Sequence, residues 1–273
     1  MYELPEARIV SAQIKSALSS KQVIDVEINH DPHKFAFFNH PHADYRDLLL
    51  NKRVIDAYSY SSRIVILFED VEFLVWDGAR MHYHESNLDK PIKRQFRLTF
   101  SERDAIYITV QMYGGIEVWQ KGDEENKYLI AAKTKPNPLS DAFTYAYFGS
   151  LFIEETLNLS LKAFLATNQR IPGLGNGVLQ DLLFYAGLHP KRKVGSLNES
   201  ERLNLFASIV RELNLMVEMG GRDSEADLFG AYGNYKTLAS RFKQNEVCPI
   251  CGGHFIKESY LGGAIYYCPK CQK

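Results

Sequence analysis

The residues best suited to chemistry are four cysteines near the end of the chain. Cys248 and Cys251 form one Cys-x-x-Cys pair, Cys268 and Cys271 form another, and sixteen residues separate the pairs. This layout is typical of a tetrahedral zinc site, because each tight pair can aim two thiolates at one ion. Disulfides or a redox pair are the alternatives. The acidic N-terminal residues lack the basic segment of a secretory signal, so we expect a cytoplasmic protein whose thiols stay reduced.

The stretch between the cysteine pairs predicts a β-hairpin. Gly262 and Gly263 lie between two apolar and aromatic runs, which places the turn near these glycines. A hairpin this small cannot fold by hydrophobic burial alone. We therefore expect one structural zinc ion per chain, with His254 as a bystander because four thiolates already complete the coordination shell.

A second candidate site is the segment from Asn168 to Asn176, which reads NQRIPGLGN. Gly173 and Gly175 permit tight turns, and Asn176 can cap the helix expected to follow. Free N–H groups at such a helix start can bind a phosphate. A dinucleotide-binding loop would need a strand before the glycines, whereas a helix is expected there. A purely structural turn between two helices is the other alternative.

The elements that must position these residues change in character along the chain. Residues 5–19 predict a helix that begins at Pro5. Strands are predicted at 24–28, 63–68, 71–76 and 106–113, with another ending at Trp119, and Glu69-Asp70 predicts a hairpin turn. The first ~130 residues therefore predict a β-sandwich or flattened barrel.

Helical patterns dominate the rest of the chain. Residues 134–140 contain two prolines and predict a linker, and residues 141–167 are apolar at helical spacing. Ser196 and Glu199 predict a capping box for a helix that ends at Gly220-Gly221. The sequence predicts an α+β protein with a β-sandwich domain (1–133), a helical domain (134–240) and a zinc finger (241–273).

Composition and charge limit the kinds of molecule that the chain is expected to bind. The chain is 45% hydrophobic and 12% aromatic and carries a net charge of −1. No apolar run is long enough to span a membrane, so we expect no membrane partner. Residues 236–273 carry six Lys or Arg against two acids. A local basic face on a neutral protein fits nucleic-acid contact, and a solvated surface is the alternative.

Three motifs together resemble one protein family. They are the N-terminal Met-x-Glu-Leu-Pro-Glu, the helix–two-turns–helix segment with Gly-x-Gly-Asn, and the Cys-Pro-x-Cys finger that closes in Cys-Gln-Lys. In this order they resemble the formamidopyrimidine-DNA glycosylase / endonuclease VIII family of base-excision repair proteins. The resemblance implies an N-terminal β-sandwich with a leading helix, a helix–two-turns–helix domain and a zinc-finger hairpin.

The resemblance also implies a reaction and a partner. Enzymes of this family flip a damaged base out of double-stranded DNA, and the amine of an N-terminal proline attacks the sugar C1′. A Schiff base forms and the strand is cleaved by elimination. For this chain we expect double-stranded DNA with a lesion or abasic site as the partner, no nucleotide cofactor, and a monomer that acts at the bacterial nucleoid.

The sequence departs from the family at the nucleophile. Position 2 is Tyr2 and not proline, so the candidate amine belongs to Met1 or, if Met1 is removed, to Tyr2. Retention of Met1 would displace the amine by up to about 3.8 Å, which is large beside the ~1 Å that costs about 100-fold in rate. Glu3, which the resemblance implicates in opening the sugar ring, is retained.

Other positions change as well. The resemblance places a catalytic lysine near Ser62 and a phosphate-gripping arginine at or next to Gly263. Its base-stack wedge falls near residues 111–113, where an apolar or flat side chain can still insert between bases, although ordinary strand residues are the alternative. The candidate DNA-binding residues are Asn168, Gly175, Asn176, Met112, Tyr113 and Lys257.

These features predict a DNA glycosylase with atypical or weakened lyase chemistry. The alternative is a protein that binds damaged or distorted DNA without turnover. RNA binding through the same turn and finger is a third hypothesis.

Overall fold

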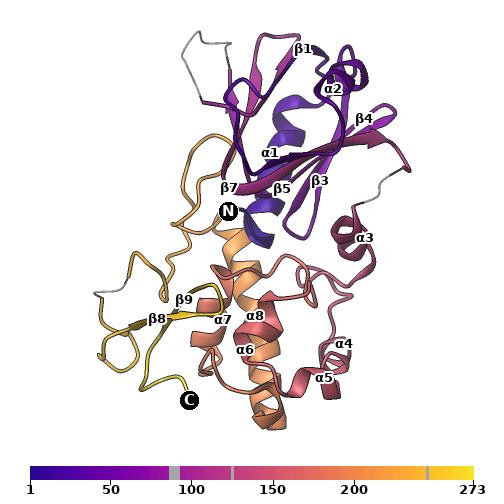
Figure 1. Ribbon diagram of the computed structural model, residues 1–273. Coiled ribbons are helices and arrows are strands. Elements are labelled where there is room, and N and C mark those ends of the chain that lie inside the picture. Colours follow the sequence, from indigo (N-terminus) through magenta and orange to yellow (C-terminus); the bar gives the residue numbers. More distant parts are fainter. Residues whose placement is uncertain (86–92, 124–125, 244–245) are drawn as a thin grey trace. The chain divides into compact units, whose positions relative to one another are not determined.

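The computed structural model describes residues 1–85, 93–123, 126–243 and 246–273. They form two compact units, one made of residues 1–130 with 225–233 and the other of residues 131–224 with 234–273 (Figure 1). Among the described residues, no helix is both long and apolar enough to cross a membrane.

The first unit is a helix followed by a β-sheet. Helix α1 spans Leu4–Leu18 and has Pro5 in its first turn, which confirms the predicted leading helix. The strands are β1 (Val23–Ile28), β2 (Ala36–Phe38), β3 (Val54–Tyr60), β4 (Arg63–Phe68), β5 (Val71–His84), β6 (Phe96–Phe100) and β7 (Ala105–Gln120). They are bonded in the order β1-β6-β7-β5-β4-β3, and β2 pairs with β7 in parallel. Helix α2 (His42–Leu49) lies between β2 and β3 in the chain.

Helix α1 and both ends of this sheet share one core. Ile14 of α1 packs in the same cluster as Val23 of β1, Val54 of β3 and Phe73 of β5. Alternation along each strand directs these side chains to one face of the sheet. The strands thus form one continuous sheet whose two ends contribute to the same core.

Strand β7 joins two segments that the sequence pattern predicts as separate strands. It pairs with β5 along most of its length, with a register shift between Asp77 and Ala79. Near this bulge, a Cβ atom at Gly115, which pairs with Trp76, would lie 1.9 Å from the indole of Trp76. Glycine at this position lets the strand continue past the indole ring.

The second unit is mostly helical. Helix α3 (Lys127–Thr134) begins in the first unit and ends in the second. The remaining elements are α4 (Tyr145–Ser150), α5 (Glu154–Leu157), α6 (Leu161–Ala166), α7 (Val178–Tyr185), the 3₁₀ helix η1 (Val194–Ser196), α8 (Glu199–Glu218), β8 (Ile256–Tyr260) and β9 (Gly263–Tyr267). Leu182 of α7, Ile209 of α8 and Phe164 of α6 share its main core.

Of two local expectations for this unit, the helical segment is confirmed and the capping box is wrong. The apolar segment 141–167 forms three short helices, because Thr144 and Ser160 act as N-caps, each accepting a backbone N–H three residues ahead, and begin new helices. The capping box of α8 is formed by Asn198 and Glu201 instead of Ser196 and Glu199. The hydroxyl of Ser196 instead donates to the carbonyl of Lys193. The predicted glycine end of α8 is confirmed, since Gly220 and Gly221 both have positive φ.

The predicted C-terminal hairpin is present. Strands β8 and β9 pair antiparallel, with Tyr260 opposite Gly263. Leu261 and Gly262 make the two-residue turn with φ of 49° and 71°, values that suit a tight hairpin connection.

Candidate metal centre and nucleic-acid interface

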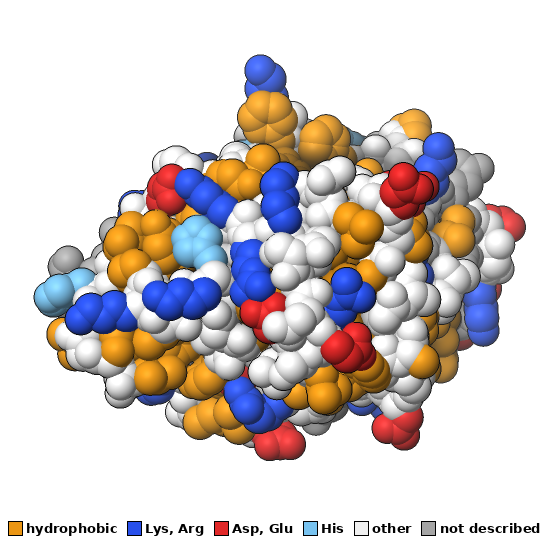
Figure 2. Space-filling model, turned by 90° about the horizontal axis from the view of Figure 1, so that it is seen from below, with side chains coloured by type: hydrophobic (Ala, Val, Ile, Leu, Met, Phe, Trp, Pro, Cys, Tyr) orange, Lys and Arg blue, Asp and Glu red, His pale blue; other side chains and the backbone are white. Residues whose placement is uncertain are grey.

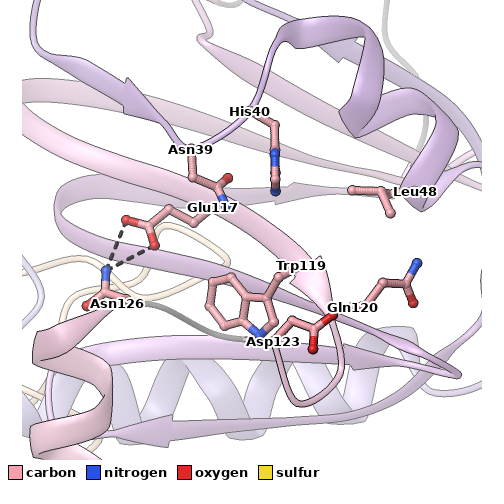
Figure 3. A pocket seen from close by; sticks show the side chains of 8 residues that line it. All are labelled: Asn39, His40, Leu48, Glu117, Trp119, Gln120, Asp123 and Asn126. Carbon is pink, nitrogen blue, oxygen red and sulfur yellow. Dashed lines mark hydrogen bonds between the residues drawn. The ribbon is translucent and has the colours of Figure 1, made fainter.

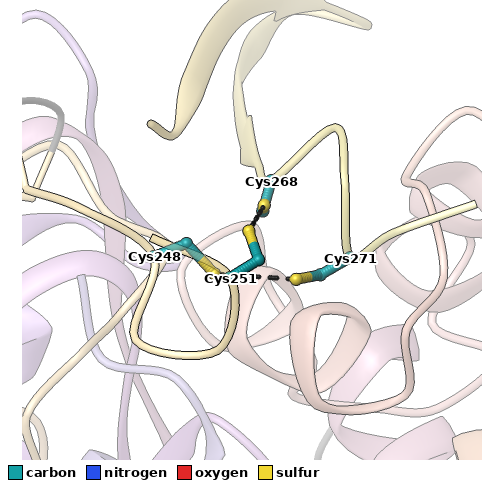
Figure 4. A group of neighbouring side chains, drawn as sticks. All are labelled: Cys248, Cys251, Cys268 and Cys271. Carbon is teal, nitrogen blue, oxygen red and sulfur yellow. Dashed lines mark hydrogen bonds between the residues drawn. The ribbon is translucent and has the colours of Figure 1, made fainter. Parts of the chain in front are cut away.

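The four cysteines converge at the base of this hairpin (Figure 4). Their sulfur atoms all lie within 4.8 Å of one another. Tetrahedral zinc with Zn–S bonds of about 2.3 Å needs sulfurs about 3.8 Å apart, so these residues fit a single ion. The Sγ atoms of Cys251 and Cys268 are 3.4 Å apart, which is too long for a disulfide. Among the residues that the structure describes, no other metal-ligand cluster of this kind occurs.

The second unit positions this centre through its own core. Phe184 of α7 packs against Phe255, with ring centroids 5.5 Å apart. Gln272 accepts the backbone N–H of Cys268 at 2.8 Å and donates to the carbonyl of Leu188 at 2.9 Å. These contacts tie both ends of the finger to the helices.

The turn before α7 contacts the hairpin directly. The side-chain amide of Asn176 donates to the carbonyl of Ala264 at 2.9 Å, and Gln180 accepts the N–H of Tyr266 at 3.0 Å. The exposed Asn176 therefore lies where the turn meets the hairpin. Gly175 is half-buried beside it, while Asn168 is exposed at the start of the turn with φ of 56°.

A buried lysine reaches the hairpin tip from α6. Lys162 is 5% exposed, and its Nζ donates to the carbonyl of Tyr260. A Cβ atom at Gly263 would lie 3.4 Å from this Nζ and 3.6 Å from the amide nitrogen of Asn176. Burial lowers the pKa of Lys162. Sequence reasoning misses this cation, although a single lysine within the apolar run SLKAFLA is the available signal.

Lys257 is exposed on β8, opposite Tyr266 in the hairpin register. Figure 2 shows one face of the molecule on which Lys and Arg side chains lie in several places between hydrophobic and acidic ones, without forming one continuous patch.

Tyr2 belongs to the core of the first unit. Its side chain is 3% exposed, and its hydroxyl donates to the carbonyl of Met81 at 3.1 Å. Burial raises the pKa of this phenol. Glu3 is also buried and forms a capping box with Glu6 at the start of α1. The carboxylates of both glutamates are thus close to the N-terminal end of the helix.

The α-ammonium of Met1 lies in an ion pair with a residue from a distant part of the sequence. Its nitrogen is 2.9 Å from a carboxylate oxygen of Glu225, and the same oxygen pairs with Arg80 on β5. The side chains of Glu225 and Arg80 are each 16% exposed. Sequence reasoning misses both residues, because 145 positions separate them and no motif links them.

Ser62 and Arg63 lie at the tip of the β3–β4 hairpin. Ser61 and Ser62 make the turn, and Arg63 begins β4 with only 2% exposure. Its Nε and Nη1 are buried without a hydrogen-bond partner, and its guanidinium lies 5.4 Å from the ring centroid of Tyr128. Burial lowers the pKa of Arg63, and the nearby Asp77 partly opposes this change.

The two predicted wedge residues are exposed on β7. Met112 is 68% exposed and Tyr113 is 42% exposed. Strand β2, which pairs with β7, adds Phe37, which stacks on Trp76 with an interplanar angle of 2°. Exposed apolar side chains at a close strand crossing are available for contact with a partner.

A cavity of about 530 Å³ lies elsewhere in the first unit (Figure 3). Glu117 points into it but already accepts hydrogen bonds from Asn126 and from the indole N–H of Trp76. The lining residues are Asn39, His40, Leu48, Glu117, Trp119, Gln120, Asp123 and Asn126. None of the predicted site residues lines it.

Comparison with known proteins agrees with this architecture. The family model of the formamidopyrimidine-DNA glycosylase H2TH domain matches residues 135–227. A formamidopyrimidine-DNA glycosylase of Brevibacillus brevis is 27% identical over 283 residues, covering 100% of this chain and 99% of the relative. One from Carboxydothermus hydrogenoformans is 36% identical over 141 residues, which is 50% of this chain and 53% of that protein.

Solved structures show the same fold. The MutM (Fpg) protein of Thermus thermophilus matches with a TM-score of 0.81 at 24% identity, over 99% of this chain and 98% of that one. Lactococcus lactis Fpg in complex with abasic-site DNA matches with a TM-score of 0.83 at 21% identity, over 99% of both chains.

The sheet with its leading helix, the H2TH region and the four-cysteine hairpin define the Fpg-type class of fold. Residues 135–227 carry the H2TH domain of formamidopyrimidine-DNA glycosylases, and the whole chain is similar to proteins of that name, with Tyr2 in place of the N-terminal proline that the resemblance implies.

Proposed function

We propose that the chain is a base-excision-repair protein of the DNA glycosylase type that binds damaged or abasic double-stranded DNA and has weakened lyase chemistry. Its relatives are named formamidopyrimidine-DNA glycosylases, and one structural neighbour holds abasic-site DNA. The single observation that carries the weakened chemistry is Tyr2, which fills a core position where the resemblance expects a free proline amine. We expect action at the bacterial nucleoid, as a monomer.

The chemistry requires a neutral amine at a defined place. In the reaction that the resemblance implies, the amine nitrogen bonds to C1′, the bond to the damaged base breaks, and the base leaves with the electron pair and takes up a proton. A buried tyrosine side chain cannot substitute for that amine. Glu3, which the resemblance implicates in ring opening, forms the capping box with Glu6 and supplies no nucleophile.

We assign DNA contacts to both units. In the second, the turn with Asn168, Gly175 and Asn176 is proposed to hold a phosphate, and Lys257 adds charge on the hairpin. Gly263 cannot grip the backbone, so we propose that Lys162 supplies the cation at the tip. In the first unit, Met112 and Tyr113 are proposed to enter the base stack.

We propose that Cys248, Cys251, Cys268 and Cys271 hold one zinc ion per chain. The ion would act structurally, because four thiolates leave no open coordination position for a substrate. Holding the finger closed would fix the hairpin against Asn176 and Gln180. We also propose the functional division 1–133, 134–240 and 241–273.

The test is the incubation of purified protein with an abasic-site duplex, with binding measured by gel shift and nicking by denaturing gel. Binding with slow nicking would support the proposal. Equal affinity for undamaged and abasic duplex would argue against damage recognition.

A protein that binds damaged DNA without turnover is the second candidate function. The ion pair between Met1 and Glu225 favours it, since the terminal nitrogen contacts a carboxylate in the structure. Borohydride trapping on abasic DNA separates the candidates, because only an amine nucleophile leaves a covalent band.

A further inference from the structure

The segment 225–233 is anchored in the first unit although it follows α8 in the sequence. Leu228 is 1% exposed and belongs to the core of that unit. Its backbone N–H donates to Gln13 of α1 at 3.1 Å, and its carbonyl accepts the N–H of Tyr83 at 2.9 Å. Gln13 also donates to Asp227 at 2.7 Å. The segment is therefore fixed by one buried side chain and several hydrogen bonds.

The segment is also internally braced. One oxygen of the Asp227 carboxylate accepts the backbone N–H groups of Phe229 and Ala231, both at 2.9 Å. Phe229 packs edge-on against Tyr83, with ring centroids 5.5 Å apart. This bracing sets the position of Glu225, two residues before Asp227.

Glu225 brings its carboxylate to the first residue of the chain. One oxygen contacts both the Met1 nitrogen, at 2.9 Å, and the guanidinium of Arg80. Tyr2, buried next to Met1, fixes the backbone from which this nitrogen extends. The ion pair is thus formed between two anchored segments, so little conformational entropy opposes it.

We infer that Glu225 and Arg80 are positioning residues that hold the Met1 amine in a shared ion pair, and that segment 225–233 thereby restrains the amine from nucleophilic attack. We call Met1, Arg80 and Glu225 the N-terminal lock. A nitrogen in this ion pair must leave the carboxylate before it can attack a carbonyl carbon. Arg80 contacts the same carboxylate oxygen and so helps to keep it beside Met1. The consequence for DNA rests on the proposed function, but the lock itself is a property of the free protein.

The lock is tested without DNA by reductive methylation of the intact protein with formaldehyde and cyanoborohydride. Intact mass first establishes that Met1 carries a free amine. Peptide mass mapping then gives the ratio of the methylation rate at the Met1 α-amine to the rate at exposed lysines. Glu225→Gln should raise this ratio about three- to fivefold, as expected for loss of a partly exposed ion pair. Glu225→Asp should fall between the two, and Glu218→Gln, an exposed glutamate on α8, should leave the ratio unchanged.

Leu228→Ala provides a second route to the same result, because it removes the anchor and leaves the charges intact. It too should raise the ratio. Equal labelling of the wild type and Glu225→Gln, in proteins with matching circular dichroism, would overturn the lock, as would a preparation in which Met1 is absent or blocked.

Borohydride trapping of Glu225→Gln on abasic DNA is a separate readout. Faster labelling with a new covalent band would support both the lock and a latent amine chemistry. Faster labelling without a band would support the lock while removing amine chemistry from the proposed function.

Discussion

At the scale of single residues, the burial of Tyr2 explains why the start of this chain is held against the core of the first unit. Its ring packs in the core with α1 and the sheet, and its hydroxyl bonds to the backbone of Met81. The sequence alone shows that proline is missing, but it does not show that the replacement is buried. Burial makes position 2 a structural residue whose substitution affects folding as well as chemistry.

Replacing Tyr2 with proline should therefore not convert the chain into an efficient lyase. We expect Tyr2→Pro to lower the free energy of unfolding by about 2–4 kcal/mol, because a large buried side chain and its hydrogen bond are lost. Urea denaturation measures this loss, with Tyr2→Phe as the matched control at about 1 kcal/mol. A Tyr2→Pro variant as stable as the wild type and nicking like a proline-bearing relative would contradict this prediction.

Asp181 is the residue whose charge should couple stability to pH. It is 1% exposed and accepts the backbone N–H groups of Leu238 and Ala239. Burial raises its pKa to about 6, and these hydrogen bonds oppose the rise. An unfolded aspartate has a pKa of about 3.9, so between about pH 4 and 6 the folded chain binds a proton that the unfolded chain does not. Stability from this group therefore increases as the pH falls through 6.

Asp181→Asn should remove this dependence. The free energy of unfolding of the wild type, measured relative to that of the variant, should rise by about 1.3 kcal/mol between pH 7 and pH 5. The comparison at each pH cancels other titrating groups, including the cysteines. If the free energies of unfolding of the two proteins change in parallel with pH, the pKa of the Asp181 carboxyl is not raised by folding.

At the scale of elements, the finger combines a hairpin with a four-cysteine centre. Cys268→Ser should reduce the zinc content from one ion per chain to none and should unfold the hairpin, because metal binding supplies the folding energy of such a small module. Elemental analysis and DNA affinity measure the two effects. His254→Ala is the control, since His254 lies exposed inside the finger. Retained zinc and affinity in Cys268→Ser would contradict the assignment.

The turn before α7 should contribute equally to the affinity for DNA of any sequence. Asn176→Ala removes both its contact to Ala264 and the proposed phosphate contact. We expect affinity to fall about 5- to 10-fold for all duplexes, because phosphate contacts position the protein without reading bases. Gel shifts on several sequences decide this, with Glu218→Gln as control. An unchanged affinity would leave the turn with a structural role alone.

Local sequence patterns predict these elements well where one residue type dictates geometry. The cysteine spacing and the glycines at 262–263 and 220–221 place the finger, its hairpin turn and the end of α8. Apolar periodicity indicates helix at 141–167 but does not show the breaks, because Thr144 and Ser160 cap new helices within a continuous apolar pattern. The partners of Met1 and the burial of Lys162 depend on contacts between distant segments, which no local pattern encodes.

At the scale of the whole molecule, the fold matches that of the solved Fpg structures, while Tyr2 stands where the resemblance expects the nucleophile. The H2TH segment, the four cysteines and Glu3 are present, whereas Tyr2 is buried and the Met1 nitrogen is paired with Glu225. We therefore expect the chain to bind damaged DNA even though its strand cleavage is weak. An abasic or unpaired base lowers the cost of flipping, so binding does not require the nucleophile.

The central claim is tested most directly by a single-turnover assay on abasic-site duplex in which binding and nicking are measured in the same reaction. The Brevibacillus brevis formamidopyrimidine-DNA glycosylase is the comparison enzyme. We predict binding that exceeds that of undamaged duplex, with nicking at least about 100-fold slower than the comparison enzyme, as displacement of the amine implies. Nicking at a comparable rate would contradict the account and would show that another amine of this chain does the chemistry.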